Sequence, residues 1–330
     1  MKLSVVIPTY NREKLLVQTL QSLGNAQIPP DLIVEIMVVN NNSTDGTEKV
    51  IKEFKTKIKN VDVIALKEEK QGRSAAVNTG IRHAKGDLVA MIDDDIQVNS
   101  DWFVEVAKVF GERWDKVDFI GGKVLPIWEI EPPKWVLEIK DVGICWRDYG
   151  EEEWEYSTKT PIVTGGHAVF KREIFDEIGF YSEELGVKKK NLISCEDDVM
   201  FEKLLKAEKR GIYSPKLVVN HYVPAHRLNK SYFRQWNFGA GISWDLVDQH
   251  HQPFTGARIW KVPRYMYRNA IVGVWEKLKS IIRRDEIDSL KSEKDILLLF
   301  GFFYSRNIVN SKLDNPLKKI VSRRIQIAER

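Results

Sequence analysis

The stretch Leu88-Val89-Ala90-Met91-Ile92-Asp93-Asp94-Asp95 decides the fold and the chemistry that we expect of this chain. Its five apolar residues form a run typical of a buried strand, and three acids follow directly. Neighbouring carboxylates repel one another, and burial increases the repulsion. A folded protein keeps such a cluster mainly where a cation neutralises it, and carboxylate oxygens suit Mg²⁺ or Mn²⁺ carrying a phosphorylated ligand. A solvated turn of acids is the alternative interpretation.

Around this stretch, apolar runs rich in Val and Ile alternate with amphipathic segments. We expect strands at 3–7, 33–39, 61–66 and 88–92, and helices at 14–23, 44–57 and 74–84. This alternation predicts βαβ units and an α/β fold with a mainly parallel sheet. Ligands of such sheets bind outside the carboxyl ends of the strands. The polar clusters 8–11, 40–43 and 93–95 all follow predicted strands, so we expect them to share one binding site.

The composition bounds the class of protein. The chain has 330 residues, of which 43% are hydrophobic and 30% charged, and a net charge of +4. Residues 256–330 alone contain 17 Lys and Arg against 8 Asp and Glu. A basic tail favours contact with phosphate, in lipid headgroups or nucleic acid, although solvated helix faces give the same composition. Nucleic acid is disfavoured because no recognisable reading module accompanies the charge.

Cysteine content and hydropathy indicate a cellular setting. Cys145 and Cys195 are far apart and form no CxxC pattern, which disfavours a zinc site or disulfide framework and favours a reducing cytoplasm. The N-terminal residues resemble a strand more than a signal peptide. No run approaches the roughly 18 apolar residues that a membrane-spanning helix needs. We therefore expect a cytoplasmic protein.

The later part of the chain is less regular. Residues 117–161 contain Trp128, Trp135, Trp146 and Trp154 among acids and predict a long excursion. A glycine turn and strand are expected at 163–170, a helix at 194–210 and a short strand at 218–221. From Pro224 onward the sequence is helical, aromatic and basic. We expect one domain over 1–225 and a helical extension over 226–330.

Four stretches together resemble glycosyltransferase family 2. They are Ser4-Val5-Val6-Ile7-Pro8-Thr9-Tyr10-Asn11-Arg12, Val38-Val39-Asn40-Asn41-Asn42-Ser43-Thr44-Asp45-Gly46-Thr47, Gly72-Arg73-Ser74-Ala75-Ala76-Val77-Asn78-Thr79-Gly80 and Asp93-Asp94-Asp95. Their order and spacing match over residues 1–225. The resemblance implies a GT-A fold (a Rossmann-like mixed, mainly parallel sheet flanked by helices), a nucleotide-sugar donor, Mn²⁺ or Mg²⁺, and inversion at the anomeric carbon.

The resemblance also assigns residues to the donor. The residues that it places around the nucleotide sugar are Pro8, Thr9, Tyr10, Arg12, Asn40, Asn42, Arg73, Asp93, Asp94, Gly165 and Gly166. Asn40 stands where the family usually has Asp, and because an amide donates as well as accepts, the base is less defined. UDP is the expected nucleotide, with GDP, dTDP and CDP left open. Arg73 is expected at the diphosphate, which a guanidinium fork suits; a solvated arginine at a helix start is the alternative.

The metal and the base are assigned in the same way. Asp95 is expected to contact the metal, together with Asp93 and His221, although a lone histidine is often structural. Asp197 is expected to be the general base that deprotonates the acceptor hydroxyl, with Glu196 orienting the acceptor. A capping box of Ser194 and Asp197 is the alternative interpretation. His167 and His226 are weaker candidates for acceptor or phosphate contact. Gly165-Gly166 is expected to let the backbone approach the donor sugar or the acceptor without interference from a Cβ, with a plain turn as the alternative.

The acceptor side is the least defined. The four Trp residues of the excursion either stack on acceptor sugars or pack a flap onto the core. Phe233-Arg234-Gln235-Trp236 replaces the QxxRW motif of the family's processive synthases, which favours addition of a single sugar. Aromatic and basic residues of the tail fit either an anionic membrane surface or packing onto the catalytic domain. Membrane docking would favour a polyprenyl-linked saccharide acceptor on the cytoplasmic leaflet. Nothing in the sequence predicts the oligomeric state.

The sequence therefore predicts a metal-dependent, inverting, non-processive glycosyltransferase that builds a surface polysaccharide, glycolipid or glycoprotein glycan. A non-catalytic nucleotide-sugar-binding protein is one alternative, which the intact acidic clusters disfavour. A sugar-1-phosphate nucleotidyltransferase is the other, and it lacks the expected glycine-rich loop after the first strand.

Overall fold

The computed structural model describes residues 1–58, 61–140, 143–186 and 192–309. The chain divides into two compact units. The first comprises Met1–Glu129, Cys145–Glu183 and Glu196–Val223; the second comprises Ile130–Ile144, Glu184–Cys195 and the chain from Pro224 onward. Each unit is described by itself below.

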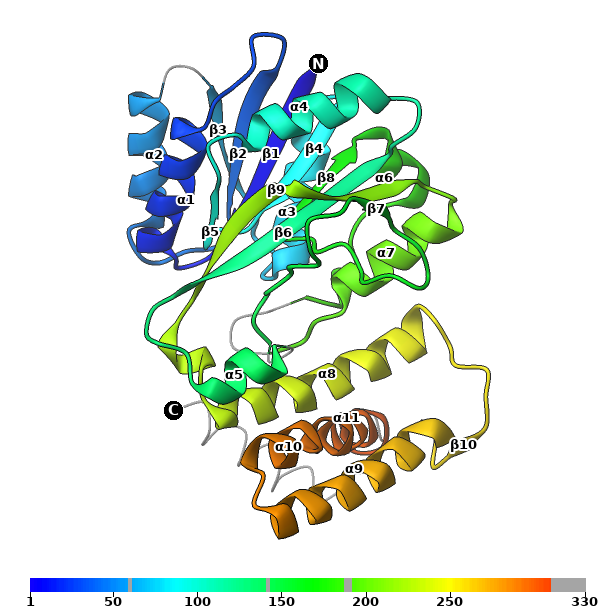
Figure 1. Ribbon diagram of the computed structural model, residues 1–330. Coiled ribbons are helices and arrows are strands. Elements are labelled where there is room, and N and C mark those ends of the chain that lie inside the picture. The colour runs from blue at the N-terminus through cyan, green and yellow to red at the C-terminus, as the bar shows by residue number, and fades with distance from the viewer. Residues whose placement is uncertain (59–60, 141–142, 187–191, 310–330) are drawn as a thin grey trace. The chain divides into compact units, whose positions relative to one another are not determined.

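The first unit is built on a nine-stranded sheet (Figure 1). Its strands are β1 (Lys2–Thr9), β2 (Ile33–Asn40), β3 (Asp62–Lys67), β4 (Leu88–Ile92), β5 (Ile96–Val98), β6 (Phe119–Trp128), β7 (Trp154–Glu155), β8 (His167–Lys171) and β9 (Gly211–Val223). They are ordered β3-β2-β1-β4-β8-β6-β9-β5, with β7 paired to β9. Strands β3, β2, β1 and β4 are parallel, whereas β8 is antiparallel to both of its neighbours. The sheet is therefore mixed, with a parallel half formed by the N-terminal βαβ units.

Helices cover both faces of this sheet, as Figure 1 shows. The helices α1 (Glu13–Asn25), α2 (Thr47–Lys57) and α4 (Trp102–Arg113) contribute to one buried cluster that includes Leu16, Phe54 and Trp102. The helices α3 (Arg73–His83), α6 (Glu173–Ile178) and α7 (Glu196–Lys206) contribute to a second one that includes Val77 and Phe201. Successive strand residues point to opposite faces, so Val5 and Val6 of β1 belong to different clusters.

The predicted elements of the first third are all present, and the α/β fold with a mixed, mainly parallel sheet is confirmed. The predicted strand at 218–221 is too short, because β9 has 13 residues. Its interior contains Pro215, which donates no hydrogen bond, and the β6–β9 register shifts between Gly122 and Lys123. The irregularity broke the apolar pattern from which the strand was predicted. The helix predicted at 194–210 spans only Glu196–Lys206.

The second unit is helical, as predicted for the chain beyond Pro224. Its elements are α5 (Lys134–Ile139), η1 (Ala225–Arg227), α8 (Lys230–His250), β10 (Arg258–Ile259), β11 (Val262–Pro263), α9 (Arg264–Arg283), α10 (Glu286–Lys291), α11 (Glu293–Tyr304) and η2 (Ser305–Val309). Two glycines let α8 and α11 approach closely. A Cβ on Gly241 would lie 2.3 Å from the Leu298 oxygen, and one on Gly301 would lie 2.0 Å from the Phe238 oxygen. No helix among the described residues is long and apolar enough to span a membrane.

A buried ionic network ties η2 to α8. Asp245 is fully buried, and its Oδ1 accepts a hydrogen bond of 2.5 Å from Arg306 Nε. Arg306 also donates to Asp248, whose other oxygen accepts from Arg258 at 2.7 Å. These contacts, against the opposing effect of burial, lower the pKa of Asp248 to about 2. Opposite charges at short range thus offset the cost of burying Asp248, whereas burial still raises the pKa of Asp245 against the effects of Ser305 and Arg306.

Two helical glycines provide a matched test of the packing in the first unit. A Cβ on Gly80 of α3 would lie 2.2 Å from Val6 Cγ1, whereas one on Gly111 of α4 would meet nothing within 4 Å. We expect Gly80→Ala to lower the free energy of unfolding by about 1–3 kcal/mol through overpacking. Gly111→Ala should raise it by about 0.5–1 kcal/mol, because alanine favours helix. Urea unfolding of both variants measures the difference, and equal effects would contradict the close approach of α3 to β1.

Candidate active site

The acids after β4 lie where strand pairing brings other predicted residues beside them. In the β4–β8 pair, Ile92 lies opposite His167, so the preceding Gly166 adjoins Asp93, and the Asp93 amide donates to the Gly166 oxygen. In the β5–β9 pair, Ile96 lies opposite His221, so His221 adjoins Asp95. The predicted metal and donor residues after β4 thus meet partners that lie about 70 and 125 positions further along the chain.

Arg73 joins two groups of carboxylates. It is the first residue of α3, and its Nε and Nη2 lie 2.9 and 2.8 Å from Asp93 Oδ1. Its Nη1 lies 3.4 Å from Glu196 Oε1, at the start of α7. Burial alone would lower the pKa of Arg73, but Asp93, Asp197 and Glu196 raise it well above its usual value. A permanently charged guanidinium therefore holds Asp93 and Glu196 together.

Asp95 has a separate set of partners. Its Oδ1 lies 3.6 Å from His221 Nε2, and its Oδ2 lies 3.6 Å from Arg12 Nη1. Beside it, burial and then the charge of Asp95 raise the pKa of Asp94 to about 7, although Arg12 and the Thr9 hydroxyl act in the opposite direction. The predicted arginine after β1 thus faces the acids after β4.

The residues after β4 fit a divalent cation in part. Mg²⁺ holds its ligands at about 2.1 Å in an octahedron, which puts neighbouring ligand atoms about 3 Å apart and opposite ones about 4.2 Å apart. The 3.6 Å between Asp95 Oδ1 and His221 Nε2 lies between these two separations, so a small shift of either side chain would be needed for both to contact one ion. Within the described ranges, no three His, Cys, Asp or Glu side chains are placed to hold a metal by themselves. Phosphate oxygens would have to complete the coordination.

Gly165 and Gly166 leave room for two carboxylates. A Cβ on Gly165 would lie 2.0 Å from Asp197 Oδ1, and one on Gly166 would lie 2.4 Å from Asp93 Oδ2. The Gly165 amide also donates to Asp197 Oδ2 at 2.9 Å. These glycines are expected to let the backbone approach the donor or acceptor closely. The structure adds that each one adjoins a carboxylate from another part of the chain.

Glu196 and Asp197 form a buried pair at the start of α7. Burial and then the charge of Asp197 raise the pKa of Glu196 to about 8, against the effect of Arg73. The pKa of Asp197 is also raised by burial, with Arg73 and the Gly165 amide opposing. Asp197 Oδ1 is buried and has no hydrogen-bond partner among the residues that the structure describes. The Ser194 amide donates to Ser243 Oγ and not to the Asp197 side chain, so these two residues do not form the reciprocal hydrogen bonds of a capping box.

The residues predicted around the nucleotide lie at the ends of β1 and β2. Thr9 and Asn40 are neighbours in the β1–β2 register, and Asn40 Oδ1 accepts from the Ser43 amide at 2.9 Å. Asn42 has a φ of 64° and its side chain donates to the Glu69 oxygen. Pro8 is the penultimate residue of β1, and Tyr10, the first residue after the strand, is half-buried. The Asn40 side-chain oxygen already accepts one hydrogen bond, from the Ser43 amide. A nucleobase would have to compete with that hydrogen bond or use the remaining donor and acceptor sites of the amide.

Two residues that position the site were not singled out in the sequence. The Asn41 side chain donates to the Glu68 and Lys70 oxygens and accepts from the Gly72 amide at 2.8 Å, which fixes the loop before Arg73. The resemblance includes Asn41 in a matching stretch but assigns it no role. Asn78 on α3 donates to the Tyr181 oxygen and accepts from its amide. Such contacts over 103 positions leave no local pattern.

Other predicted residues have structural partners. His167 is buried and accepts a 3.0 Å hydrogen bond from Trp102 Nε1, and burial lowers its pKa to about 3. It is therefore a neutral histidine held within the first unit. His226 is exposed in the second unit. Cys195 is buried, as expected, although its φ is 74°.

The tryptophans of the excursion contact aromatic rings of the protein. Trp128 packs edge-on against Trp146, with ring centroids 5.8 Å apart, and Trp154 stacks on Tyr213 at 4.9 Å. Trp135 packs on Phe233 inside the second unit. These contacts favour the packing interpretation for Trp135, which is buried, while Trp128 and Trp146 stay half-buried.

Solved structures share the fold of the chain. A mannosyltransferase from Pyrobaculum calidifontis, in complex with GDP-Man and Mn²⁺, superposes with a TM-score of 0.62 and 18% identity, over 92% of this chain and 86% of that one. TarS 1–349 of S. aureus in complex with UDP superposes with a TM-score of 0.53 and 16% identity, over 90% of each chain. The mixed sheet with its helical C-terminal region is thus the GT-A fold.

The family model described as glycosyl transferase family 2 matches residues 4–179. That match spans more than half of the 330 residues, and the chain therefore belongs to glycosyltransferase family 2. It is similar to the glucosyl-dolichyl phosphate glucuronosyltransferase of Haloferax volcanii, with 26% identity over 92% of this chain and 93% of that protein. It is also 34% identical to glycosyltransferase AglE of the same organism, over 37% of this chain and 38% of AglE.

The space at Gly165 gives a test of the site geometry. Gly165→Ala should displace the Asp197 carboxylate, because the new Cβ would lie 2.0 Å from Oδ1. Misplacement of a reacting group by about 1 Å costs roughly 10²-fold in rate, so we expect a comparable fall in kcat for glycosyl transfer. Gly111→Ala, at an open helical position, is the control and should keep wild-type turnover. A Gly165→Ala enzyme with unchanged kcat would show that Asp197 is not positioned by this contact.

The buried His167 predicts a pH-dependent stability. The folded protein keeps it neutral down to its pKa of about 3, while a histidine in the unfolded chain titrates near pH 6.5. Its contribution is therefore present above about pH 6.5 and is lost as the pH falls. Relative to His167→Gln, the wild type should lose about 1–3 kcal/mol of unfolding free energy between pH 7 and pH 4.

Comparison with this variant is necessary because the raised pKa values of Asp94 and Glu196 act with the opposite sign in both proteins. Urea unfolding at several pH values measures the difference. Parallel pH profiles for the two proteins would contradict a buried neutral His167.

Proposed function

We propose that the protein is a metal-dependent, inverting glycosyltransferase that moves a single sugar from a nucleotide-sugar donor to a saccharide or polyprenyl-linked saccharide. One observation carries the proposal: Arg73 joins Asp93, on the donor side, to Glu196 and the adjacent Asp197. Donor-binding and base-carrying carboxylates thereby form one connected site. This arrangement is what transfer from a diphosphate to a hydroxyl requires.

Asp197 is the proposed general base. One of its oxygens accepts from the Gly165 amide, and the other is buried without a partner among the described residues. An acceptor hydroxyl could donate its hydrogen bond to that second oxygen and then lose its proton to it as the new bond forms. The raised pKa favours proton uptake by Asp197. Glu196 would orient the acceptor from its position between Arg73 and Asp197.

Asp95, with His221 and Asp93, would hold Mn²⁺ or Mg²⁺ together with the donor diphosphate. A bound divalent cation supplies Lewis-acid stabilisation of the charge that develops on the leaving nucleoside diphosphate. In the protein described here, Arg12 and Arg73 neutralise Asp95 and Asp93. Both arginines lie close enough to these acids to exchange them for phosphate oxygens when the donor binds.

The nucleotide and the acceptor follow from weaker support. UDP remains the proposed nucleotide; the solved structures that share the fold include complexes with UDP and with GDP-Man. The relative that matches nearly the full chain is named for a glucosyl-dolichyl phosphate acceptor, which supports a polyprenyl-linked saccharide here. Such an acceptor stays in the membrane, so the enzyme would work as a peripheral protein on the inner face of the cell membrane.

The role of Asp197 is tested by comparison with its neighbour. Asp197→Asn should lower transfer by about 10²–10⁴-fold, because an amide cannot accept the proton. Its thermal stabilisation by nucleotide sugar and Mn²⁺ should be retained. Asp198→Asn, which changes the same charge one position further along α7, should keep most of the activity. An Asp197→Asn enzyme with wild-type turnover would remove Asp197 as the base.

Removal of the metal tests the donor site separately. Turnover should be abolished by EDTA and restored by excess Mn²⁺, since the diphosphate loses the cation that neutralises it. The measurement is release of nucleoside diphosphate from a panel of nucleotide sugars. Full activity in EDTA would contradict metal dependence while leaving Asp197 untouched.

A further inference from the structure

Helix α9 exposes an apolar stripe that no described part of the chain covers. Its inward face is narrow and consists of Met266, Ala270, Gly273 and Ser280. On another side, Ile271, Trp275, Leu278 and Ile282 follow one another at intervals of three or four residues, which places them along one line of the helix. Ile271 is 69% exposed, Trp275 60% and Ile282 83%. These four residues, the α9 stripe, form the kind of continuous apolar surface that marks an interaction site.

Cations continue the same line. Arg264 and Arg268 precede Ile271 at the same intervals, and both are exposed. Neither forms an ion pair with any part of the chain that the structure describes. In all, α9 contains five Lys or Arg residues and a single Glu, Glu276, which pairs with Lys279. The apolar surface is thus bordered by positive charge that no acid of the helix neutralises.

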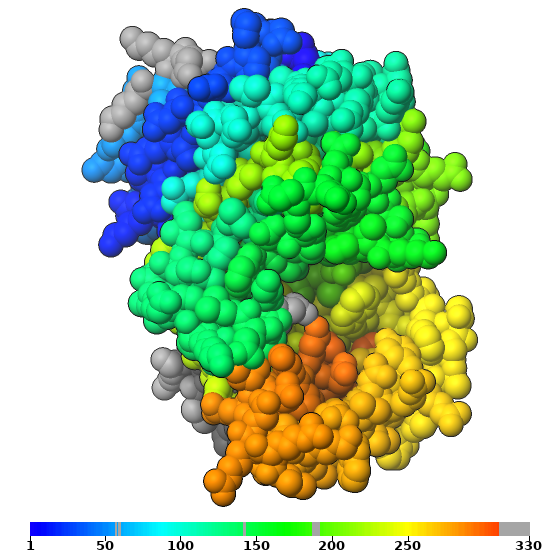
Figure 2. Space-filling view, viewed as in Figure 1, coloured from blue at the N-terminus to red at the C-terminus, as the bar shows by residue number. Residues whose placement is uncertain are grey.

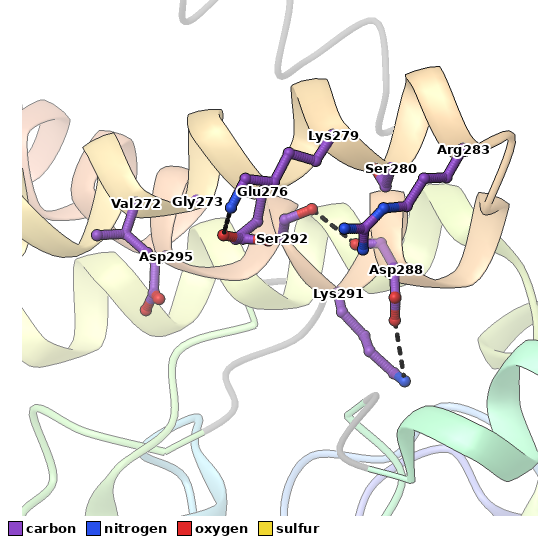
Figure 3. Close-up of a pocket in the computed structure, with 10 residues that line it drawn as sticks. All are labelled: Val272, Gly273, Glu276, Lys279, Ser280, Arg283, Asp288, Lys291, Ser292 and Asp295. Carbon is purple, nitrogen blue, oxygen red and sulfur yellow. Dashed lines mark hydrogen bonds and ion pairs between the residues drawn. The ribbon is translucent and has the colours of Figure 1, made fainter.

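The opposite flank of α9 has a different character. Figure 3 shows a cavity there that is lined largely by charged and polar residues of α9, α10 and α11. Among them, Glu276 pairs with Lys279, and Lys291 lies 3.5 Å from Asp288. Charges of both signs compensate one another on this flank. Apart from Val272, which also lines the cavity, this flank is polar, so the continuous apolar surface lies on the side of the stripe.

A strained hairpin extends the stripe at its N-terminal end. The two-residue turn between β10 and β11 consists of Trp260 and Lys261, with φ values of 46° and 64°. Turns with two positive φ angles favour Asn-Gly, so tryptophan is conformationally costly here. Trp260 is nevertheless 72% exposed. Tyr267 lies on α9, four residues before Ile271, and its hydroxyl donates to the Ile259 oxygen of the hairpin. This hydrogen bond links the hairpin to the side of α9 that carries the stripe.

We propose that the α9 stripe and the Trp260–Lys261 turn dock onto the surface of an anionic lipid bilayer. Apolar side chains bordered by arginines, with an exposed tryptophan beside them, suit the headgroup boundary, where the rings and aliphatic chains enter the lipid and the cations meet phosphate. Figure 1 labels α9 and β10, and the yellow and orange atoms of these segments lie at the surface in the view of Figure 2. A second copy of the chain is a poorer partner, because a two-fold contact over the stripe would set arginine against arginine if the helices ran parallel, and arginine against apolar side chains if they ran antiparallel.

This surface deepens the proposed function, on which its purpose rests, because a polyprenyl-linked acceptor is reached only at a membrane. The binding itself depends on the second unit alone. No residue of the surface belongs to the candidate active site in the first unit. Lipid binding and donor binding can therefore fail independently of each other.

Vesicle flotation with the full chain tests the proposal. The protein should bind vesicles of phosphatidylcholine mixed with phosphatidylglycerol, and binding should weaken with added salt and with phosphatidylcholine alone. Ile271→Ser/Ile282→Ser should weaken binding by about tenfold for each side chain, and Arg268→Gln by about fivefold. Ile33→Ser, which changes an isoleucine of 65% exposure in the first unit, is the matched control and should bind normally.

The turn supplies a variant that cannot be mistaken for misfolding. Trp260→Asn/Lys261→Gly introduces the pair that this turn favours, so the fold should be at least as stable as the wild type. Its affinity for anionic vesicles should nevertheless fall by about tenfold or more, because the exposed ring and one charge are lost. A more stable variant with weaker lipid binding would separate docking from folding. Undiminished binding would remove the turn from the surface.

The outcomes divide the two proposals. Absence of vesicle binding, with thermal stabilisation by nucleotide sugar retained, would overturn membrane docking and leave the proposed transfer intact. Vesicle binding without any response to nucleotide sugars would leave docking intact and overturn the transfer. Light scattering decides the remaining alternative: a dimer that Ile271→Ser/Ile282→Ser dissociates, together with no vesicle binding, would assign the stripe to a second copy.

Discussion

Compensation of buried negative charge is the constraint on which the catalytic unit depends. Asp93, Asp94, Asp95, Glu196 and Asp197 come from two distant segments and lie within one site. Without cations their repulsion would oppose folding, as the raised pKa values of Asp94 and Glu196 indicate. Arg73 and Arg12 offset part of this repulsion. Under the proposed function, binding of a metal and a diphosphate would relieve the remaining cost.

The sequence predicted the parts of this arrangement that have a local pattern. Apolar runs in β1, β2, β3 and β4 located the parallel half of the sheet, and the polar residues after them marked the rim. The β4 acids were identified in this way, Arg73 was identified by the resemblance to the family, and the two meet in the structure. A parallel sheet makes such predictions effective, because its strand ends necessarily converge.

The other features of the fold and site could not be predicted, because they depend on contacts between residues that are far apart in the sequence. The 13-residue β9 contains a proline and a register shift, so periodicity revealed only its last part. The relation of Gly165 to Asp197 required the position of α7, and the contacts of Asn41 and Asn78 required folded loops. The sequence left open whether the aromatic and basic tail faces a membrane or packs on the catalytic domain. Apolar residues at helical spacing predict an amphipathic helix whether they face a core or a membrane, and only the structure shows which side is covered.

The ionic network around Arg306 determines how far the polypeptide can be shortened from its C-terminal side without loss of stability. A chain shortened before that residue would leave Asp245 and Asp248 deep in α8 without the guanidinium that they share. Loss of one partner from a buried ion pair costs about 3–5 kcal/mol, a large part of the stability of an ordinary domain. Shortened versions made for crystallography or for fusion to other proteins would therefore need to retain the polypeptide through η2, even though this turn is far in sequence from every residue expected to touch a sugar.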